Sequence, residues 1–220
     1  MSVWAVVAAA GSGERLGSDR PKAFARLGDL PLLAESLRRL DDSAWVDGIV
    51  VAAPPGWEEP AILLAEEIGA GKVSASVRGG STRAQSVQIA LDEVPEDAAV
   101  VVVHDAARPL LPDDLFDRLL EPLSEGWDAV VPAMPLADTV KRVRAGQVVE
   151  TLDRAELVAA QTPQAFVADV LRRAVASGAD ATDCAALVEA AGGRVRVVEG
   201  DRRLVKVTTP DDLALVESWL

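Results

Sequence analysis

The residues best suited to chemistry lie in a glycine-rich segment near the N-terminus. It follows an apolar run from Val3 to Ala10 that is typical of a buried parallel strand. Gly11 and Gly13 would let main-chain N–H groups approach a phosphate closely, and Arg15 and Lys22 add positive charge within a few residues. The pattern predicts a nucleotide-phosphate site at the carboxyl end of a strand, although a lone Gly-x-Gly is also typical of an ordinary turn.

This segment differs from the two commonest phosphate-binding loops. A Walker loop needs Gly-Lys-Ser/Thr after a four-residue gap, and the chain has no such sequence. The dinucleotide fingerprint needs a third glycine, and Leu16 stands at that position. The sequence therefore argues against both a P-loop NTPase and a nicotinamide dehydrogenase.

A second glycine-rich loop follows the third predicted strand. The strand is expected over Val73 to Val77, and the loop contains Gly80, Ser81 and Arg83. Ser81 or Thr82 can cap the helix expected to continue to Val94. Backbone N–H groups and the helix dipole favour an anion or the polar edge of a nucleotide here. Taken alone, the loop is equally typical of a plain strand-to-helix turn.

A third set of polar residues follows the apolar run from Ala98 to Val103. Asp105 comes just after the expected strand, where a carboxylate can hold a divalent cation between protein and phosphates. Arg108, before a proline, can reach the same edge. His104 is the only histidine, which argues against a zinc site and a histidine-based triad, so we expect it to be structural.

Composition limits the classes of function. The chain has 220 residues, is 50% hydrophobic, carries a net charge of −13 and has one cysteine. These values predict one domain over residues 1–220, without a disulfide framework. The acidic balance argues against nucleic-acid binding, and no apolar stretch is long enough for a membrane span, so we expect a cytoplasmic protein. Any phosphate affinity must come from a local basic pocket.

The pattern of elements predicts an α/β fold with a mostly parallel sheet and a protruding β-hairpin arm at about 138–152. An arm of this kind can pack on a second subunit, and we expect a homodimer. Further strands are expected over Gly48 to Ala53, Ala129 to Ala133, Arg194 to Glu199 and Leu204 to Val207. Further helices are expected over Leu30 to Leu40, Glu58 to Ile68, Phe166 to Ser177, from a Thr182 cap to Gly192, and from Thr209 onward.

Several segments together carry a family resemblance. Besides the opening loop with Pro21-Lys22, they are Val-His-Asp-Ala-Ala-Arg-Pro at 103–109, Asp-Thr-Val-Lys at 138–141, Thr-Pro-Gln at 162–164, Thr-Asp at 182–183, and the stretch from Val198 to Thr208. In this order they resemble the 2-C-methyl-D-erythritol 4-phosphate cytidylyltransferases over nearly the whole chain. The opening loop together with the segment at 103–109 is highly specific.

The resemblance implies a Rossmann-like nucleotidyltransferase that uses Mg²⁺ to join CTP to 2-C-methyl-D-erythritol 4-phosphate in non-mevalonate isoprenoid synthesis. It implies that Arg15, Lys22 and Lys206 stabilise charge on the triphosphate and that Asp105 holds the metal and faces the acceptor. The implied nucleotide contacts are Ala9, Ala10, Gly11, Gly13, Gly80, Ser81, Arg83 and Ser86. The implied acceptor contacts are Asp105, Arg108, Thr139, Arg154 and Thr162, with Arg154 acting on the other subunit's site.

The chain departs from the common family pattern at Ala23, Ser81 and Cys184. Ser81 replaces a common acidic residue, so it offers a neutral hydrogen bond that is weaker by about 1 kcal/mol. Two alternatives stay open at this point. One is a cytidylyltransferase for another polyol phosphate, such as ribitol 5-phosphate, and the other is a nucleotide-binding module without catalysis.

Overall fold

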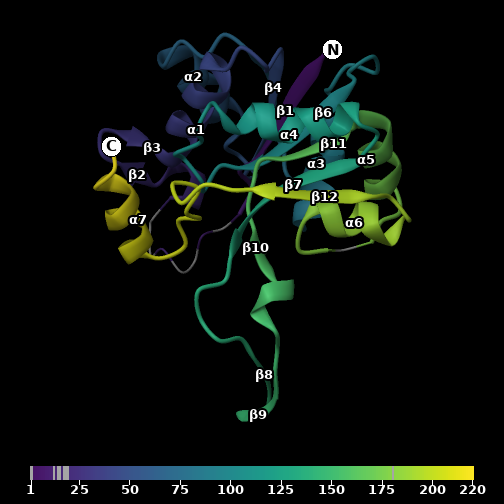
Figure 1. Cartoon of the computed structure of the whole chain (residues 1–220). Helices are drawn as coiled ribbons and strands as arrows, with labels where there is room; N and C mark the ends of the chain where they lie inside the picture. The colour runs from purple at the N-terminus through teal and green to yellow at the C-terminus, as the bar shows by residue number, and fades with distance from the viewer. Residues whose placement is uncertain (1, 12, 14–15, 17–19, 180) are drawn as a thin grey trace.

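The main β-sheet of the described structure is mixed. The computed structural model describes residues 2–11, 13, 16, 20–179 and 181–220. Within those residues the sheet has eight strands in the order β10-β7-β11-β6-β1-β4-β5, and β12 pairs with β7 outside this path (Figure 1). The strands are β1 (Val3–Ala8), β4 (Gly48–Ala53), β5 (Val73–Arg78), β6 (Val100–Asp105), β7 (Ala129–Pro135), β10 (Val158–Ala160), β11 (Gln164–Val167) and β12 (Val195–Glu199).

The parallel part of the sheet is centred on β1. Ala5 of β1 is paired with Ile49 of β4 on one side and with Val102 of β6 on the other, and all three residues are fully buried. Because successive side chains point to opposite faces, Ala5 and Val7 pack in one hydrophobic cluster and Val6 in another. A strand buried on both faces explains the unbroken apolar runs in the sequence.

Helices cover both faces of the sheet. Apolar residues of α1 (Leu32–Asp42), α2 (Glu58–Glu67) and α4 (Leu115–Ser124) pack on the face that contains Ala5 and Val7. Those of α3 (Arg83–Leu91), α5 (Ala168–Val175) and α6 (Cys184–Ala190) pack on the opposite face (Figure 1). The predicted α/β class with a mostly parallel sheet is confirmed. None of the helices in the described part of the chain is long and apolar enough to cross a bilayer.

The region before α5 differs from the prediction. We expected a helix from Phe166, but residues 164–167 form β11, which is antiparallel to β6 and β7. Phe166 is fully buried and pairs in register with Val101 and Ala129. The expectation was wrong because a short apolar run before a helix fits the periodicity of a strand as well as that of a helix. Only pairing with the two neighbouring strands decides which of the two forms.

Three smaller expectations also need correction. β6 continues through His104 and Asp105, so Asp105 is the last residue of the strand and not the first residue after it. The segment from Leu204 to Val207 forms no strand in the described structure; Leu204 N donates to the Asp201 carbonyl at 3.1 Å and Val207 N to the Ala107 carbonyl at 2.8 Å. The cap of α6 is Asp183, whose carboxylate accepts from Ala186 N, and not Thr182.

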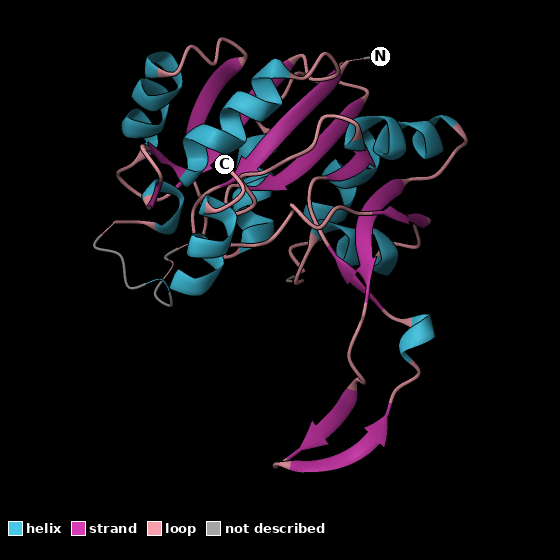
Figure 2. Ribbon diagram, turned by 60° about the vertical axis from the view of Figure 1, so that its left-hand side comes forward, coloured by secondary structure: helices cyan, strands magenta, loops and turns pink. Residues whose placement is uncertain are grey.

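The predicted hairpin leaves the main sheet (Figure 2). β8 (Lys141–Arg144) and β9 (Gln147–Thr151) pair only with each other, and their residues are all exposed. The turn contains Ala145 at φ 47° and Gly146 at φ 79°, and two such residues suit a tight hairpin turn whose twist matches the strands. The short helix η3 (Arg154–Glu156) and β10 bring the chain back to the sheet.

The C-terminal helix α7 (Pro210–Glu217) holds the segment that carries Lys22. The last helix begins after Thr209, as expected, and Thr209 and Asp212 form a capping box there. Val216 is fully buried and belongs to the same cluster as Leu27 of β2 (Arg26–Leu27), which pairs with β3 (Leu30–Pro31). Because Lys22 begins the short helix η2 (Lys22–Phe24) just before β2, this packing helps to place Lys22.

Candidate active site

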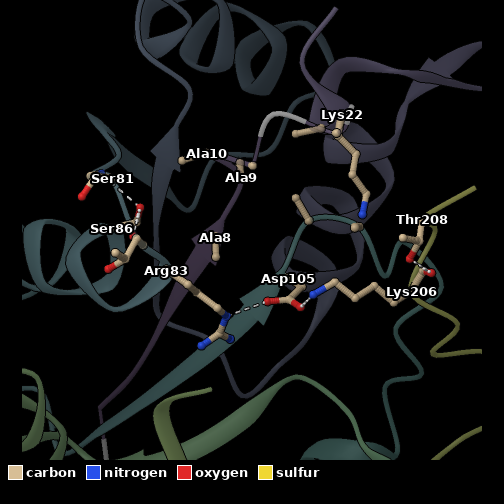
Figure 3. A pocket seen from close by; sticks show the side chains of 17 residues that line it. Ala8, Ala9, Ala10, Lys22, Ser81, Arg83, Ser86, Asp105, Lys206 and Thr208 are labelled. Atoms are coloured by element: carbon tan, nitrogen blue, oxygen red, sulfur yellow. Dashed lines mark hydrogen bonds and ion pairs between the residues drawn. The ribbon is translucent and has the colours of Figure 1, made fainter. Parts of the chain in front are cut away.

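The glycine-rich loops and the end of β6 enclose a cavity of about 750 Å³ (Figure 3). It lies at the carboxyl ends of β1, β5 and β6, the edge of an open α/β sheet where ligands bind. Its lining residues are Ala8, Ala9, Ala10, Gly11, Gly13, Lys22, Ala23, Gly80, Ser81, Thr82, Arg83, Ser86, Asp105, Ala106, Ala107, Lys206 and Thr208.

The structure brings most of the predicted site residues together. All of the predicted nucleotide contacts line the cavity, and so do Lys22, Asp105 and Lys206. Arg15 lies outside the described residues. The predicted acceptor contacts Arg108, Thr139, Arg154 and Thr162 are not among the described residues that line the cavity. Sequence reasoning missed Thr208, which follows Lys206 and whose hydroxyl donates to the Lys206 carbonyl at 2.9 Å.

Glycines allow the loops of the cavity to touch. A Cβ atom on Gly79 would lie 2.3 Å from the Cβ of Ala10, so the loops after β1 and β5 can meet only with glycine at this position. A Cβ on Gly13, which has φ of +69°, would lie 2.3 Å from the Cβ of Lys22. Sequence reasoning did not place Gly79 in the site, although the Gly-Gly pair at 79–80 was a signal.

Side chains at the start of α3 fix the second loop. Gly80 N donates to Ser86 Oγ at 3.0 Å, and Ser86 Oγ donates to the Thr82 carbonyl at 2.8 Å. Thr82 is the N-cap residue and accepts from Gln85 N at 3.1 Å, which confirms one of the two predicted caps. The N-terminus of α3, with its partial positive charge, therefore lies at the cavity.

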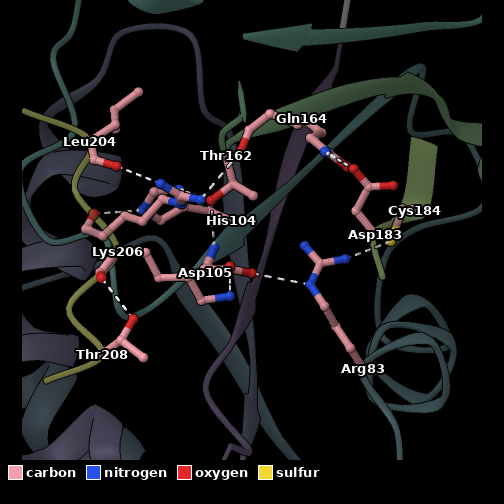
Figure 4. Close-up of polar contacts among 12 residues, drawn as sticks. Arg83, His104, Asp105, Thr162, Gln164, Asp183, Cys184, Leu204, Lys206 and Thr208 are labelled. Atoms are coloured by element: carbon pink, nitrogen blue, oxygen red, sulfur yellow. Dashed lines mark hydrogen bonds and ion pairs between the residues drawn. The ribbon is translucent and has the colours of Figure 1, made fainter. Parts of the chain in front are cut away.

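Asp105 lies between two cations from distant parts of the chain (Figure 4). Arg83 Nε donates to Oδ1 at 3.1 Å, and Lys206 Nζ donates to Oδ2 at 2.7 Å. Burial alone would raise the pKa of the Asp105 carboxyl, but the charges of Arg83 and Lys206 hold this pKa well below its usual range. Asp105 is therefore ionised, and the surplus of cations around it favours an anionic ligand.

The described residues contain no group of three or more histidine, cysteine or acidic side chains that could hold a metal ion by themselves. Among the described residues that line the cavity, Asp105 is the one that carries a carboxylate, and both of its oxygens contact a cation. Mg²⁺ commonly binds through one or two carboxylates together with substrate phosphates and water. The residues present thus fit a Mg²⁺ ion that is shared with a phosphate ligand and do not fit a site built from protein groups alone.

His104 has a structural role beneath the cavity (Figure 4). Its Nε2 lies 3.0 Å from the Arg108 carbonyl, which can only accept, so Nε2 carries the proton. Thr162 Oγ1 then donates to Nδ1 at 3.3 Å and accepts from Asp105 N at 3.0 Å. Complete burial lowers the pKa of His104 to about 4, so the ring is neutral at pH 7. Through Thr162, the neutral ring supports the backbone of Asp105.

The other three predicted acceptor residues lie toward the arm or behind Asp105. Arg108 donates from Nη1 to the Leu204 carbonyl and from Nη2 to the Ala160 carbonyl, while its Nε is buried without a hydrogen bond in the described structure. Thr139 is exposed before β8. Arg154 is exposed in η3 and donates to the Ala137 carbonyl. A single chain therefore does not bring Thr139 and Arg154 to the cavity.

Comparisons with known proteins agree with this arrangement. Residues 3–220 match the family model described as 2-C-methyl-D-erythritol 4-phosphate cytidylyltransferase. The proteins of that name from Nocardia farcinica and Saccharopolyspora erythraea are each 46% identical to this chain; the alignments cover 100% of the chain and 94% and 100% of the relatives.

Solved structures show the same fold. The crystal structure of the Thermus thermophilus enzyme is 34% identical and has a TM-score of 0.79, covering 97% of this chain and 96% of that one. The Francisella tularensis structure is 30% identical with a TM-score of 0.83, and the match covers 100% of both chains. Together with the cationic cavity at the ends of β1, β5 and β6, these matches show that the chain belongs to the family of 2-C-methyl-D-erythritol 4-phosphate cytidylyltransferases.

Proposed function

We propose that the cavity transfers CMP from CTP to 2-C-methyl-D-erythritol 4-phosphate, giving 4-diphosphocytidyl-2-C-methyl-D-erythritol and pyrophosphate in the non-mevalonate isoprenoid pathway. Family membership makes the chain a cytidylyltransferase. The observation that carries the assignment to this cavity is that Lys22, Arg83 and Lys206 all line it at the ligand-binding edge of the sheet, where Arg83 and Lys206 also pair with Asp105. A triphosphate and a sugar phosphate both need such a cationic site.

The reaction depends more on aligning the acceptor oxygen with the α-phosphorus and on neutralising phosphate charge than on a general base. A phosphate monoester has its second pKa at about 6, so the acceptor already carries a nucleophilic oxygen at pH 7. That oxygen forms a bond to the α-phosphorus of CTP, and the bond from this phosphorus to the bridging oxygen breaks as pyrophosphate leaves. Negative charge then shifts onto the leaving group, which Arg15, Lys22 and Lys206 would stabilise.

The nucleoside would occupy the side of the cavity formed by the two glycine-rich loops. Gly79 and Ala10 bring these loops into contact, so their main-chain groups can bind one ligand together. In the proposal Ala9, Ala10, Gly11, Gly80, Ser81 and Ser86 contact the base and ribose, Gly13 contacts the phosphates, and Arg83 acts from the start of α3.

We include Mg²⁺ in the proposal, held by Asp105 together with the triphosphate. When bound, the ion would neutralise phosphate charge beside the reacting phosphorus. Lys206 Nζ donates to Asp105 Oδ2 at 2.7 Å and lines the same cavity, so in the proposal this lysine would also face the phosphates.

The acceptor side of the site would be completed by a second copy of the chain. The arm has half-exposed valines at 143, 148 and 149, and a two-stranded hairpin is marginal in water unless it packs against something. In a homodimer the arm of one subunit would bring Arg154 to the partner's cavity. Arg108, Thr139 and Thr162 complete the proposed surroundings of the acceptor, within one domain over residues 1–220.

The test is pyrophosphate release from CTP with a panel of acceptors. We expect release with 2-C-methyl-D-erythritol 4-phosphate and Mg²⁺, and none after EDTA is added. A faster reaction with ribitol 5-phosphate would overturn the acceptor assignment. Tight CTP binding without release on any acceptor would overturn the assignment of catalysis to this cavity.

A further inference from the structure

An exposed glutamine contacts a hydroxyl that lines the cavity. Ser81 lies across the cavity from Lys22 and Lys206 (Figure 3). Ser81 N lies 2.7 Å and Ser81 Oγ 2.9 Å from the Oε1 atom of Gln85. Among the described residues that line the cavity Gln85 is absent, so any influence on a ligand would pass through Ser81.

The directions of these hydrogen bonds follow from the donors involved. A main-chain N–H can only donate, so the Gln85 atom that faces Ser81 N is the amide oxygen and not the amide nitrogen. Ser81 Oγ contacts the same oxygen, so it must donate its only proton to it. The lone pairs of Ser81 Oγ remain for another partner, and in this arrangement the hydroxyl can only accept.

We infer that Gln85 is a positioning residue that makes the Ser81 hydroxyl a fixed hydrogen-bond acceptor and thereby selects nucleotides that present a donor to it. The inference rests on the proposed function, which places Ser81 on the nucleoside side of the cavity. Two groups of CTP have the required chemistry, the exocyclic amine of cytosine and the 2′-hydroxyl of ribose. A serine without Gln85 could rotate and donate, and it would then discriminate less.

Other contacts hold the loop backbone independently of Gln85 Oε1. Ser86 Oγ accepts from Gly80 N, and the Thr82 side chain caps α3. Gln85 Oε1 accepts from both the main-chain N–H and the hydroxyl of Ser81. Removing the amide oxygen should therefore change the hydrogen bonding of Ser81 more than the path of the loop.

The experiment measures kcat and KM for CTP, UTP and 2′-deoxy-CTP in the intact enzyme. Gln85→Met keeps the length of the side chain but removes the acceptor, and Gln85→Glu retains an acceptor. Gln88→Met is the matched control, because Gln88 is exposed on the same helix. We expect Gln85→Met to lose about 5- to 10-fold of the discrimination against one analogue, the size of one hydrogen bond. Gln85→Glu and Gln88→Met should keep the wild-type ratio.

The analogue whose kcat/KM rises relative to that of CTP identifies the donor, since UTP lacks the amine and 2′-deoxy-CTP lacks the hydroxyl. A purely structural role predicts that Gln85→Met raises KM for all three nucleotides by the same factor, and this result would overturn the inference. Ser81→Ala separates the role of Ser81 from that of Gln85. If Ser81→Ala alone lowers discrimination, Gln85 has no such role; if neither variant changes it, Ser81 does not bind the nucleoside and the inference also fails.

Discussion

At the scale of single residues, the cavity contains a carboxylate, that of Asp105, which already pairs with two cationic side chains without a ligand. Asp105 receives one hydrogen bond from Arg83 and one from Lys206, and Thr162 holds its main chain from below. The cations around it therefore stay ordered without substrate, which lowers the cost of organising them during the reaction. Lys22 adds a further positive charge to the same cavity.

Lys22 should matter more for the chemical step than for nucleotide binding. If its ammonium stabilises charge that grows in the transition state, Lys22→Ala should lower kcat by roughly 100-fold or more, while the dissociation constant of CTP changes much less. Pyrophosphate release and CTP titration measure the two effects. Lys72→Ala is the control, because Lys72 Nζ donates to the Ser43 carbonyl and Lys72 does not line the described cavity. Equal losses in kcat and affinity would mean that Lys22 only holds the nucleotide.

His104 should make stability depend on pH. Its pKa is lowered from 6.5 to about 4 in the folded protein, so between these values the unfolded chain binds a proton that the folded chain does not. The free energy of unfolding must therefore decrease as the pH falls from 6.5 toward 4, by on the order of 3 kcal/mol in total. Below about pH 4 this contribution becomes constant.

Urea unfolding from pH 7.5 to 4.5, without nucleotide or metal, measures this dependence. His104→Gln removes the titrating ring, so the variant should have a flatter stability profile than the wild type in that range. The carboxylates titrate in both proteins, so their contribution to the pH dependence of stability cancels in the comparison. Parallel profiles would show that folding does not lower the pKa of His104.

At the scale of elements, the site depends on two loops that touch. The loops after β1 and β5 meet where Gly79 lies against Ala10. Each loop continues a strand of the same parallel sheet, so the register of β1, β4 and β5 decides how far the loops extend. A change of one methyl group at the contact should separate them.

We expect Gly79→Ala to weaken CTP binding by about 10-fold and to lower the melting temperature, because overpacking at a tight contact costs roughly 1–3 kcal/mol. The added Cβ would lie 2.3 Å from Ala10 Cβ and 3.1 Å from the Ala53 carbonyl oxygen. Gly71→Ala is the matched control, since a Cβ there meets nothing within 4 Å. Isothermal titration with CTP and thermal unfolding test the pair. A wild-type affinity in Gly79→Ala would show that the contact does not shape the nucleotide site.

At the scale of the whole molecule, the exposed arm is the feature that a single chain leaves unexplained. β8 and β9 contact each other, carry half-exposed valines and extend away from the main sheet (Figure 2). Thr139 precedes β8, and Arg154 lies in η3, which follows β9. If the arm docks on a twofold-related copy, each cavity receives Arg154 from its partner. A monomer in solution would rule out this arrangement.

Co-expressed Lys22→Ala and Arg154→Ala chains test whether Arg154 acts across the interface. In a mixed dimer the two lesions then fall in one cavity and leave the other intact. Random pairing should restore about a quarter of the wild-type activity, although both parents are nearly inactive. If Arg154 acts within its own chain, every cavity carries one lesion and mixing restores nothing. Tagged subunits would confirm that mixed dimers form.

The sequence by itself determined the features that depend on local patterns. The strand Gly48–Ala53, the hairpin within 138–152 and the helix that begins after Thr209 agree with the prediction, because periodicity, turn residues and caps act within a few residues. The predicted nucleotide contacts reach one cavity because loops that follow parallel strands meet at one edge of the sheet. The family motifs identified the activity class that the comparisons then showed.

Only the tertiary structure decided which distant residues touch. Asp105 is 22 residues from Arg83 and 101 from Lys206 in sequence. No local pattern predicts that the Asp105 carboxylate accepts hydrogen bonds from both side chains. The strand β11 was missed for the same reason, since its two partners lie far away in sequence and their pairing outweighs local helical spacing. The contact between Gly79 and Ala10 and the orientation of Ser81 by Gln85 likewise arise from packing in three dimensions, where atoms compete for space and for hydrogen-bond partners.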